Sequence, residues 1–250
     1  RAKVAEARRK LEQRAAARAE AEQPEYERKV EERDKRPGSR KGPKPKPPSS
    51  TPDANEQVNM TDEDSRIMRK SKKSEYRQAC NSQATVDADG SQLVLASDVT
   101  NCASDAGELL PGVKSVPEEL GSPTEVLADS GYVNADVFDQ LRNDGVEPYV
   151  PPSRDAAHQR RKHDFRPSKD VPAKPLNDLR LRRMRAKLDT DAGRAMYAKR
   201  KKTVEPVFGI IKEAMGFRQF LLRGLEKVRG EWGLVCLAYN FKRLHGLIRA

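Results

Sequence analysis

A basic, proline-rich segment at residues 36–53 divides this chain and limits what each side of it can fold into. The segment reads RPGSRKGPKPKPPSSTPD and holds six prolines and two glycines among its lysines and arginines. Proline lacks a backbone donor and fixes φ, so neither a helix nor a central strand runs through such a stretch. We expect residues 36–57 to form an extended, disordered linker, with the packed domain at residues 58–250.

The segment before the linker, residues 1–35, has the composition of a solvated helix. Its first 23 residues are almost all Ala, Glu, Arg, Lys and Gln, and opposite charges recur three to four positions apart. Apolar anchors are few, Val4 and Leu11 being the largest. These residues therefore predict a charged helix without a core of its own, interrupted at Pro24.

Charge and cysteine content narrow the class of protein. The chain has 49 basic and 38 acidic residues, a net charge of +11, which favours DNA or another polyanion as partner. On charge alone, a well-solvated basic surface remains the alternative. The three cysteines are far apart and match neither a disulfide framework nor a zinc site. No apolar run approaches the ~20 residues of a membrane span. We expect a cytoplasmic protein.

From about residue 75 the pattern is that of an α/β domain. Two β-rich runs, 81–87 and 91–100, flank an Asp-Gly pair and predict a hairpin. Asp105 is expected to cap a helical stretch. TEVLA (124–128) predicts a short buried strand, followed by a helix that Asn134 caps and by a strand at 146–150. Residues 178–214 and 226–248 are predicted helices, the first with a break near Thr190.

The last of these helices carries an unusual number of apolar residues. We expect it to be substantially buried against the sheet. The residues that predict this burial are Trp232, Leu234, Val235, Leu237, Ala238, Phe241, Leu244 and Leu247.

Two acidic residues are candidate metal ligands. Asp129, in ADSGY, directly follows the strand at 124–128, where α/β sheets place ligands; the alternative is an Asp that caps the next turn. Glu205, in KKTVEPVFGIIK, shares a helix face with Lys201 and Lys212. That face is either a metal-and-phosphate site or a surface ion-pair stripe.

Three longer segments resemble a known family. VLADSGY, AMYAKRKKTVEPVFGIIKEAMGFRQFLLRG and LEKVRGEWGLVCLAYNFKRL are similar, in order, to the C-terminal half of bacterial insertion-sequence DDE transposases. The likeness covers about residues 58–249 and is to the group with a long insertion before the second strand. It implies an RNase H-like fold, two Mg²⁺ ions and an Asp-Asp-Glu triad.

The resemblance assigns roles to individual residues. It makes Asp129 the second Asp and Glu205 the Glu, both metal ligands, and Lys212 a phosphate contact. A Tyr-x₂-Arg-x₃-Glu-x₆-Lys signature is kept only in part. Tyr197 and Arg200 are present, but Lys201 fills the place of the Arg. Lys212, Lys201, Arg200 and Tyr197 are therefore the candidate DNA-binding residues.

The first Asp of the triad has no counterpart at the expected place. The family carries it on a first, central strand upstream of the insertion, and this chain begins at Arg1 with what resembles the insertion's tail. Asp87, Asp62 and Asp64 are poor substitutes. We expect a transposase fragment that lacks the first strand and is inactive alone.

In the intact family member the function implied is DNA transposition by metal-dependent phosphodiester cleavage and strand transfer. The expected partners are transposon-end and target DNA, and a second copy or full-length transposase, in a bacterial, nucleoid-associated setting. The alternative is a non-catalytic fragment that binds DNA or inhibits the transposase. A host nuclease of the same fold is a further alternative that the helical C-terminus disfavours.

Overall fold

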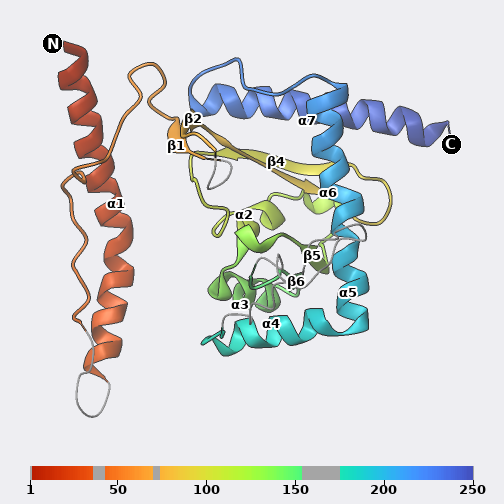
Figure 1. The fold of residues 1–250 in the computed structure, drawn as a ribbon, viewed down its shortest axis with the longest axis horizontal. Helices are drawn as coiled ribbons and strands as arrows, with labels where there is room; N and C mark the ends of the chain where they lie inside the picture. Colours follow the sequence, from red (N-terminus) through yellow and green to blue (C-terminus); the bar gives the residue numbers. More distant parts are fainter. Residues whose placement is uncertain (1, 36–42, 70–73, 154–174, 250) are drawn as a thin grey trace, which may run out of the picture. The chain divides into compact units, whose positions relative to one another are not determined.

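The computed structural model describes residues 2–35, 43–69, 74–153 and 175–249 (Figure 1). The chain divides into two compact units, residues 1–78 and 79–250. The predicted linker residues 36–42, and most of the basic stretch at 151–176, lie outside the described residues.

The first unit is built on one long helix, α1 (Ala2–Asp34). Pro24 lies inside this helix, so the predicted interruption there is wrong. Strong helix formers on both sides keep the helix continuous despite the lost donor. Ala15 is buried, and Arg18 forms an ion pair with Glu56 at 3.3 Å. Residues 43–57 form no helix or strand. Two short strands that the sequence did not predict, β1 (Arg66–Met68) and β2 (Arg77–Ala79), pair near the end of this unit.

The second unit holds two further two-stranded sheets. β3 (Asn81–Val86) and β4 (Val94–Thr100) form the predicted antiparallel hairpin, with Asn81 opposite Thr100. β5 (Glu125–Leu127) and β6 (Glu147–Tyr149) are parallel, with Glu125 opposite Glu147. In the described part of the chain the two sheets do not pair with each other.

Helices surround these sheets. α3 (Ala135–Asn143) connects β5 to β6, and Asn134 accepts hydrogen bonds from the backbone at its start, as predicted. The predicted break at Thr190 separates α4 from α5. The remaining elements are α2 (Leu109–Lys114), 3₁₀ turns at Glu118–Leu120 and Ser130–Tyr132, α4 (Leu179–Asp189), α5 (Asp191–Ala198), α6 (Arg200–Gly209), a π-helical turn at Ile210–Ala214, and α7 (Leu225–Ile248).

Two apolar clusters hold the second unit together. One joins α2, α3 and α4 to the β5–β6 sheet and has Phe138, Leu141 and Met184 at its centre. The other packs α6 and α7 against the β3–β4 hairpin around Trp232 and Ile211. The site described below lies where these clusters meet.

α7 is fixed to the hairpin by polar contacts as well. The Trp232 indole donates to the carbonyl of Gln83 at 2.8 Å. The Asn240 amide bonds both backbone groups of Val94, each at 2.8 Å, and so satisfies part of the outer edge of β4.

The burial predicted for α7 is wrong for most of its apolar residues. Val228, Trp232, Cys236 and Tyr239 face the core. The opposite side is exposed, because the hairpin covers only one face of the helix. The exposed residues are Leu234, Leu237, Ala238, Phe241, Leu244 and Leu247.

Candidate active site

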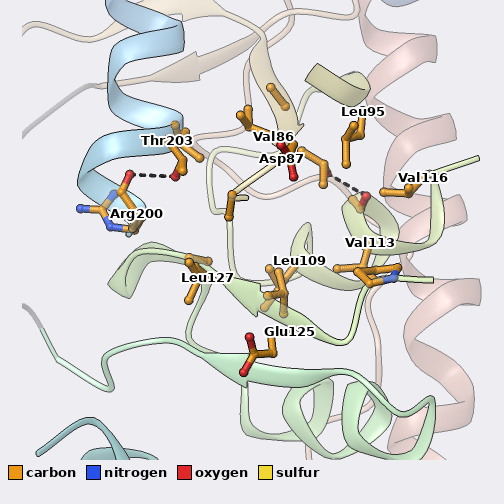
Figure 2. Close-up of a pocket in the computed structure, with 18 of the residues that line it drawn as sticks. Val86, Asp87, Leu95, Leu109, Val113, Val116, Glu125, Leu127, Arg200 and Thr203 are labelled. Atoms are coloured by element: carbon orange, nitrogen blue, oxygen red, sulfur yellow. Dashed lines mark hydrogen bonds between the residues drawn. The ribbon is translucent and has the colours of Figure 1, made fainter. Parts of the chain in front are cut away.

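A pocket of about 590 Å³ separates the two sheets of the second unit. β3 borders it on one side and β5 on the other, while α2 and α6 supply the remaining walls (Figure 2). Leu109 and Val113 of α2 face Arg200 and Thr203 of α6 across this space. Val126 and Leu127 of β5 are only half-buried, because their strand edge borders the pocket rather than another strand.

Asp129 lies on the rim of this pocket, directly after β5. Its carboxylate is exposed and accepts a hydrogen bond from the Gly131 backbone at 2.7 Å. This contact is the turn-capping arrangement that the sequence allowed as an alternative. It occupies one carboxylate oxygen only, so the other is available to a ligand.

A second carboxylate, Asp105, approaches the same turn. A Cβ atom placed on Gly131 would lie 2.9 Å from Asp129 Oδ1 and 3.2 Å from Asp105 Oδ2. A glycine at this position leaves the space in which both carboxylates come near the turn. Sequence reasoning missed this proximity, because Asp105 belongs to a loop whose path the local pattern does not specify.

Asp105 does not cap α2, contrary to the prediction. Glu108 is the capping residue, and α2 begins at Leu109. The Asp105 Oδ1 atom instead accepts hydrogen bonds from the Asn81 amide at 2.7 Å and the Gln83 amide at 3.0 Å. Because both amides project from β3, they fix the carboxylate beside the strand.

The same network reaches the turn after Asp129. The Tyr132 hydroxyl donates to Gln83 Oε1, which connects this turn to β3 through a single side chain. Burial, together with the negative charges of Asp105 and Asp129, raises the pKa of Tyr132 above its usual range. Tyr132 therefore remains a neutral donor at physiological pH.

Glu205 lies on α6 but does not line the pocket. Its side chain is 53% exposed and accepts a hydrogen bond from Arg200 Nη2 at 2.9 Å. Arg200 does line the pocket, and its Nε atom is buried without a hydrogen-bond partner. The two residues that the sequence predicted as ligands are thus separated: Asp129 is on the pocket rim and Glu205 is on the outer side of α6.

The other predicted DNA-binding residues are also outside the pocket lining. Lys201 and Lys212 are exposed, like Glu205, and Lys212 lies in the π-helical turn that follows α6. The Lys212 ammonium lies 5.4 Å from the centre of the Phe208 ring, and Arg200 lies 5.6 Å from that of Tyr197. Phe208 and Ile211 anchor this part of the chain to the core.

Asp87 lines the pocket at the far end of β3 (Figure 2). Burial alone would raise its pKa, but hydrogen bonds from Ser91 and from the Asp89 backbone hold the pKa of Asp87 below its usual range. These bonds close the hairpin turn, so the role seen for Asp87 is structural. Asp62 and Asp64 belong to the first unit.

These positions do not make a complete metal site. In the part of the chain that the structure describes, no three His, Cys, Asp or Glu side chains are grouped so that they could hold a metal ion. Asp129 and Asp105 supply carboxylate oxygen, the ligand type that Mg²⁺ prefers, but Glu205 is bound to Arg200. The predicted pair does not fit a two-metal site in this arrangement.

Residues 155–245 match the sequence model of the family described as the transposase DDE domain. This part of the chain is therefore similar to that family. The match confirms the resemblance to DDE transposases, whose function is connected with transposition and whose substrate is DNA. It covers α4 to most of α7, including Glu205 and Lys212. No curated protein and no solved structure matches the chain. None of the helices among the described residues has the length and apolar character that crossing a bilayer requires.

Proposed function

We propose that this chain is part of a DNA transposase that cleaves and joins phosphodiester bonds. The observation that carries the proposal is the match of residues 155–245 to the transposase DDE domain, a range that includes Glu205. The net charge of +11 supports a DNA substrate.

Although the pair does not form a two-metal site in the arrangement described, Asp129 and Glu205 remain the proposed ligands of Mg²⁺. Held by these carboxylates, Mg²⁺ would supply activation of the attacking hydroxyl and stabilisation of the leaving oxygen. The chain's own cations have a separate role. Lys201 and Lys212 flank Glu205 on one exposed face and are placed to contact DNA phosphates. Arg200 and Tyr197 belong to the same proposed DNA surface.

We also propose that the pocket is the place of the central first strand of an RNase H-like sheet. β3 and β5 border it from opposite sides, and neither is paired there with a described strand. Such a strand would give both edges a pairing partner. The buried, unpartnered Nε atom of Arg200 belongs to a residue that lines the same space.

The non-catalytic alternative has an observation in its favour. Glu205 is bound to Arg200, and the described residues contain no group of three metal-binding side chains. A chain with this arrangement is expected to bind DNA through its lysines without cutting it. The two candidate functions share DNA binding and differ in metal-dependent cleavage.

Three measurements on the full 250-residue chain test these proposals. Binding of a fluorescent DNA duplex, followed by anisotropy over a range of salt concentrations, should weaken steeply as salt rises. Lys201→Ala and Lys212→Ala should each reduce the salt slope by about one. Lys114→Ala, on α2, is the matched control and should leave the slope unchanged. A chain that does not bind DNA contradicts both functions.

The second measurement follows cleavage of supercoiled plasmid in Mg²⁺ or Mn²⁺. We expect the chain alone not to nick the plasmid, since the described residues hold no complete set of metal-binding carboxylates. Nicking that Asp129→Asn abolishes would establish catalysis by this chain and rule out the non-catalytic alternative. Nicking that survives both Asp129→Asn and Glu205→Gln would remove both residues from the proposed site.

The third measurement addresses the metal without relying on activity. Titration of Mn²⁺ by electron paramagnetic resonance should detect weak binding that Asp129→Asn reduces and Asp144→Asn, an exposed Asp at the end of α3, does not. Equal binding by both variants would contradict a metal role for Asp129.

A further inference from the structure

α7 presents two apolar sides, and the described residues cover only one of them. Val228, Trp232, Cys236 and Tyr239 are each less than 8% exposed and pack on the β3–β4 hairpin. On the other side, large apolar residues are between 39 and 84% exposed. They are Leu234, Leu237, Phe241, Leu244, Leu247 and Ile248. We refer to these six residues as the α7 strip.

The spacing within the α7 strip is that of a helix–helix seam. Five members, from Leu234 to Ile248, follow one another at intervals of three, four, three and four residues. This 3.5-residue repeat keeps one line of side chains facing a partner helix, with Leu at both d positions. Burial against the chain's own hairpin does not account for the repeat, because the residues that make that contact lie on the opposite face.

The residues that flank the seam on α7 are small or uncharged. They allow a second helix to approach closely, and they carry no charge pattern that would favour a different protein over a second copy of this chain. Gly233, Ala238, Asn240 and His245 flank it, and the two smallest let another helix backbone come near. In coiled coils, charged residues at such flanking positions set the choice of partner, and here no Asp, Glu, Lys or Arg is present. The seam is therefore compatible with an identical copy of itself.

The apolar area available is close to what a stable dimer needs. Taking roughly 200 Å² for a large apolar side chain, the exposed fractions of the six residues amount to roughly 700 Å² per copy. A standard interface buries about 800 Å² per partner. The flanking residues supply much of the remainder. A patch of this size left in water is unusual for a monomer.

We propose that the α7 strip is the interface through which two copies of this chain associate about a two-fold axis. In such an interface the same surface of each copy meets its equivalent, so one helix face satisfies both partners. The proposal does not depend on transposase activity.

The net charge of the chain predicts how dimerisation should depend on salt concentration. Each copy carries a net charge of +11, and Lys242 and Arg243 lie on α7 away from the seam. Two like-charged copies repel, and salt screens this repulsion while leaving the apolar seam intact. Dimerisation should therefore strengthen as salt rises, whereas association bridged by residual DNA should weaken.

Sedimentation equilibrium of the nuclease-treated full chain tests the proposal. We expect a monomer–dimer equilibrium that tightens with NaCl concentration. Leu237→Glu combined with Phe241→Glu should raise the dissociation constant at least tenfold, since it places four carboxylates in an apolar seam. The matched control is Leu120→Glu, an exposed leucine (60%) outside α7, which should not change the equilibrium.

The folded state of each variant is checked by circular dichroism, since the substituted side chains are exposed and do not contribute to either core. A monomer at all concentrations would overturn the proposal, including the case in which another segment or protein covers the strip. Dimers that the double substitution leaves unchanged would overturn it equally.

Discussion

Arg200 and Glu205, five residues apart on α6, form an ion pair in which Arg200 Nη2 donates to Glu205 Oε1 at 2.9 Å. Arg200 belongs to the pocket lining, whereas Glu205 is exposed outside it, as are Lys201 and Lys212. The pair therefore connects the pocket to the proposed DNA surface. In this ion pair the Glu205 carboxylate, proposed as a metal ligand, and the Arg200 guanidinium, proposed as a DNA contact, neutralise each other. This leads to the first prediction.

Glu205→Gln should tighten binding of the chain to a DNA duplex by about threefold, with a salt slope steeper by about one. The substitution frees the Arg200 guanidinium and removes a negative charge between two lysines. Fluorescence anisotropy at several salt concentrations measures both quantities. The control is Glu213→Gln, because Glu213 is likewise paired with an Arg five residues on, Arg218, and its loss changes the net charge equally. A similar gain in both variants would show that net charge alone is responsible.

The contact of Asp105 with β3 leads to a prediction about stability. Asp105→Ala leaves the Asn81 and Gln83 amides without their acceptor, so the free energy of unfolding should fall by about 1–3 kcal/mol. Urea denaturation followed through the fluorescence of Trp232, the only tryptophan, reports on this unit. Asp144→Ala is the control and should change stability by less than about 0.5 kcal/mol. Equal effects of the two substitutions would indicate that the network contributes little.

The sequence predicted the local structure of this chain better than its site. The hairpin around Gly90, the cap at Asn134 and the break at Thr190 were all correct, because each depends on turn or capping chemistry within a few residues. The local pattern at Pro24 wrongly predicts an interruption, because strong helix formers over the 33 residues of α1 outweigh the cost of one proline.

Features that depend on contacts between residues far apart in the sequence could not be predicted. Asp105 meets Asn81 and Gln83 from more than twenty residues away, and no spacing in the sequence connects them. In α7 the sequence marks two apolar sides but cannot say which one the hairpin covers. The metal-binding roles of Asp129 and Glu205 stay predictions. Asp129 lies on the pocket rim, whereas Glu205 is exposed on α6 outside the pocket.

Two glycines, Gly193 near the start of α5 and Gly209 at the end of α6, lead to opposite predictions about stability. A Cβ atom on Gly193 would lie 2.0 Å from the Lys187 carbonyl oxygen, so Gly193→Ala should lower the free energy of unfolding by about 1–3 kcal/mol. Gly209, at the end of α6, has nothing within 4 Å of such an atom. Gly209→Ala should therefore raise the free energy of unfolding by about 0.5–1 kcal/mol. Thermal unfolding of both variants measures the contrast, and destabilisation by Gly209→Ala would contradict the open space seen there.

Cys236 leads to a prediction about alkaline pH. Burial between α7 and the β3–β4 hairpin raises the pKa of its thiol to about 11, although a hydrogen bond with Ser97 acts in the opposite direction. In the unfolded chain a thiol loses its proton near pH 8.5. Between these values the unfolded state is ionised and the folded state is not, so stability is complete below about pH 8.5 and falls as the pH rises towards 11.

Urea denaturation at several pH values should show this loss in the native chain and a smaller loss in Cys236→Ala. Tyr132 and Tyr239 also have raised pKa values, but both are present in the two proteins, so the difference between the slopes isolates the thiol. A thiol reagent at pH 8 provides an independent readout. Cys102 is exposed and should react at once, whereas Cys236 should react only as the second unit unfolds. Rapid labelling of Cys236 in the folded protein would mean that α7 does not remain on the hairpin.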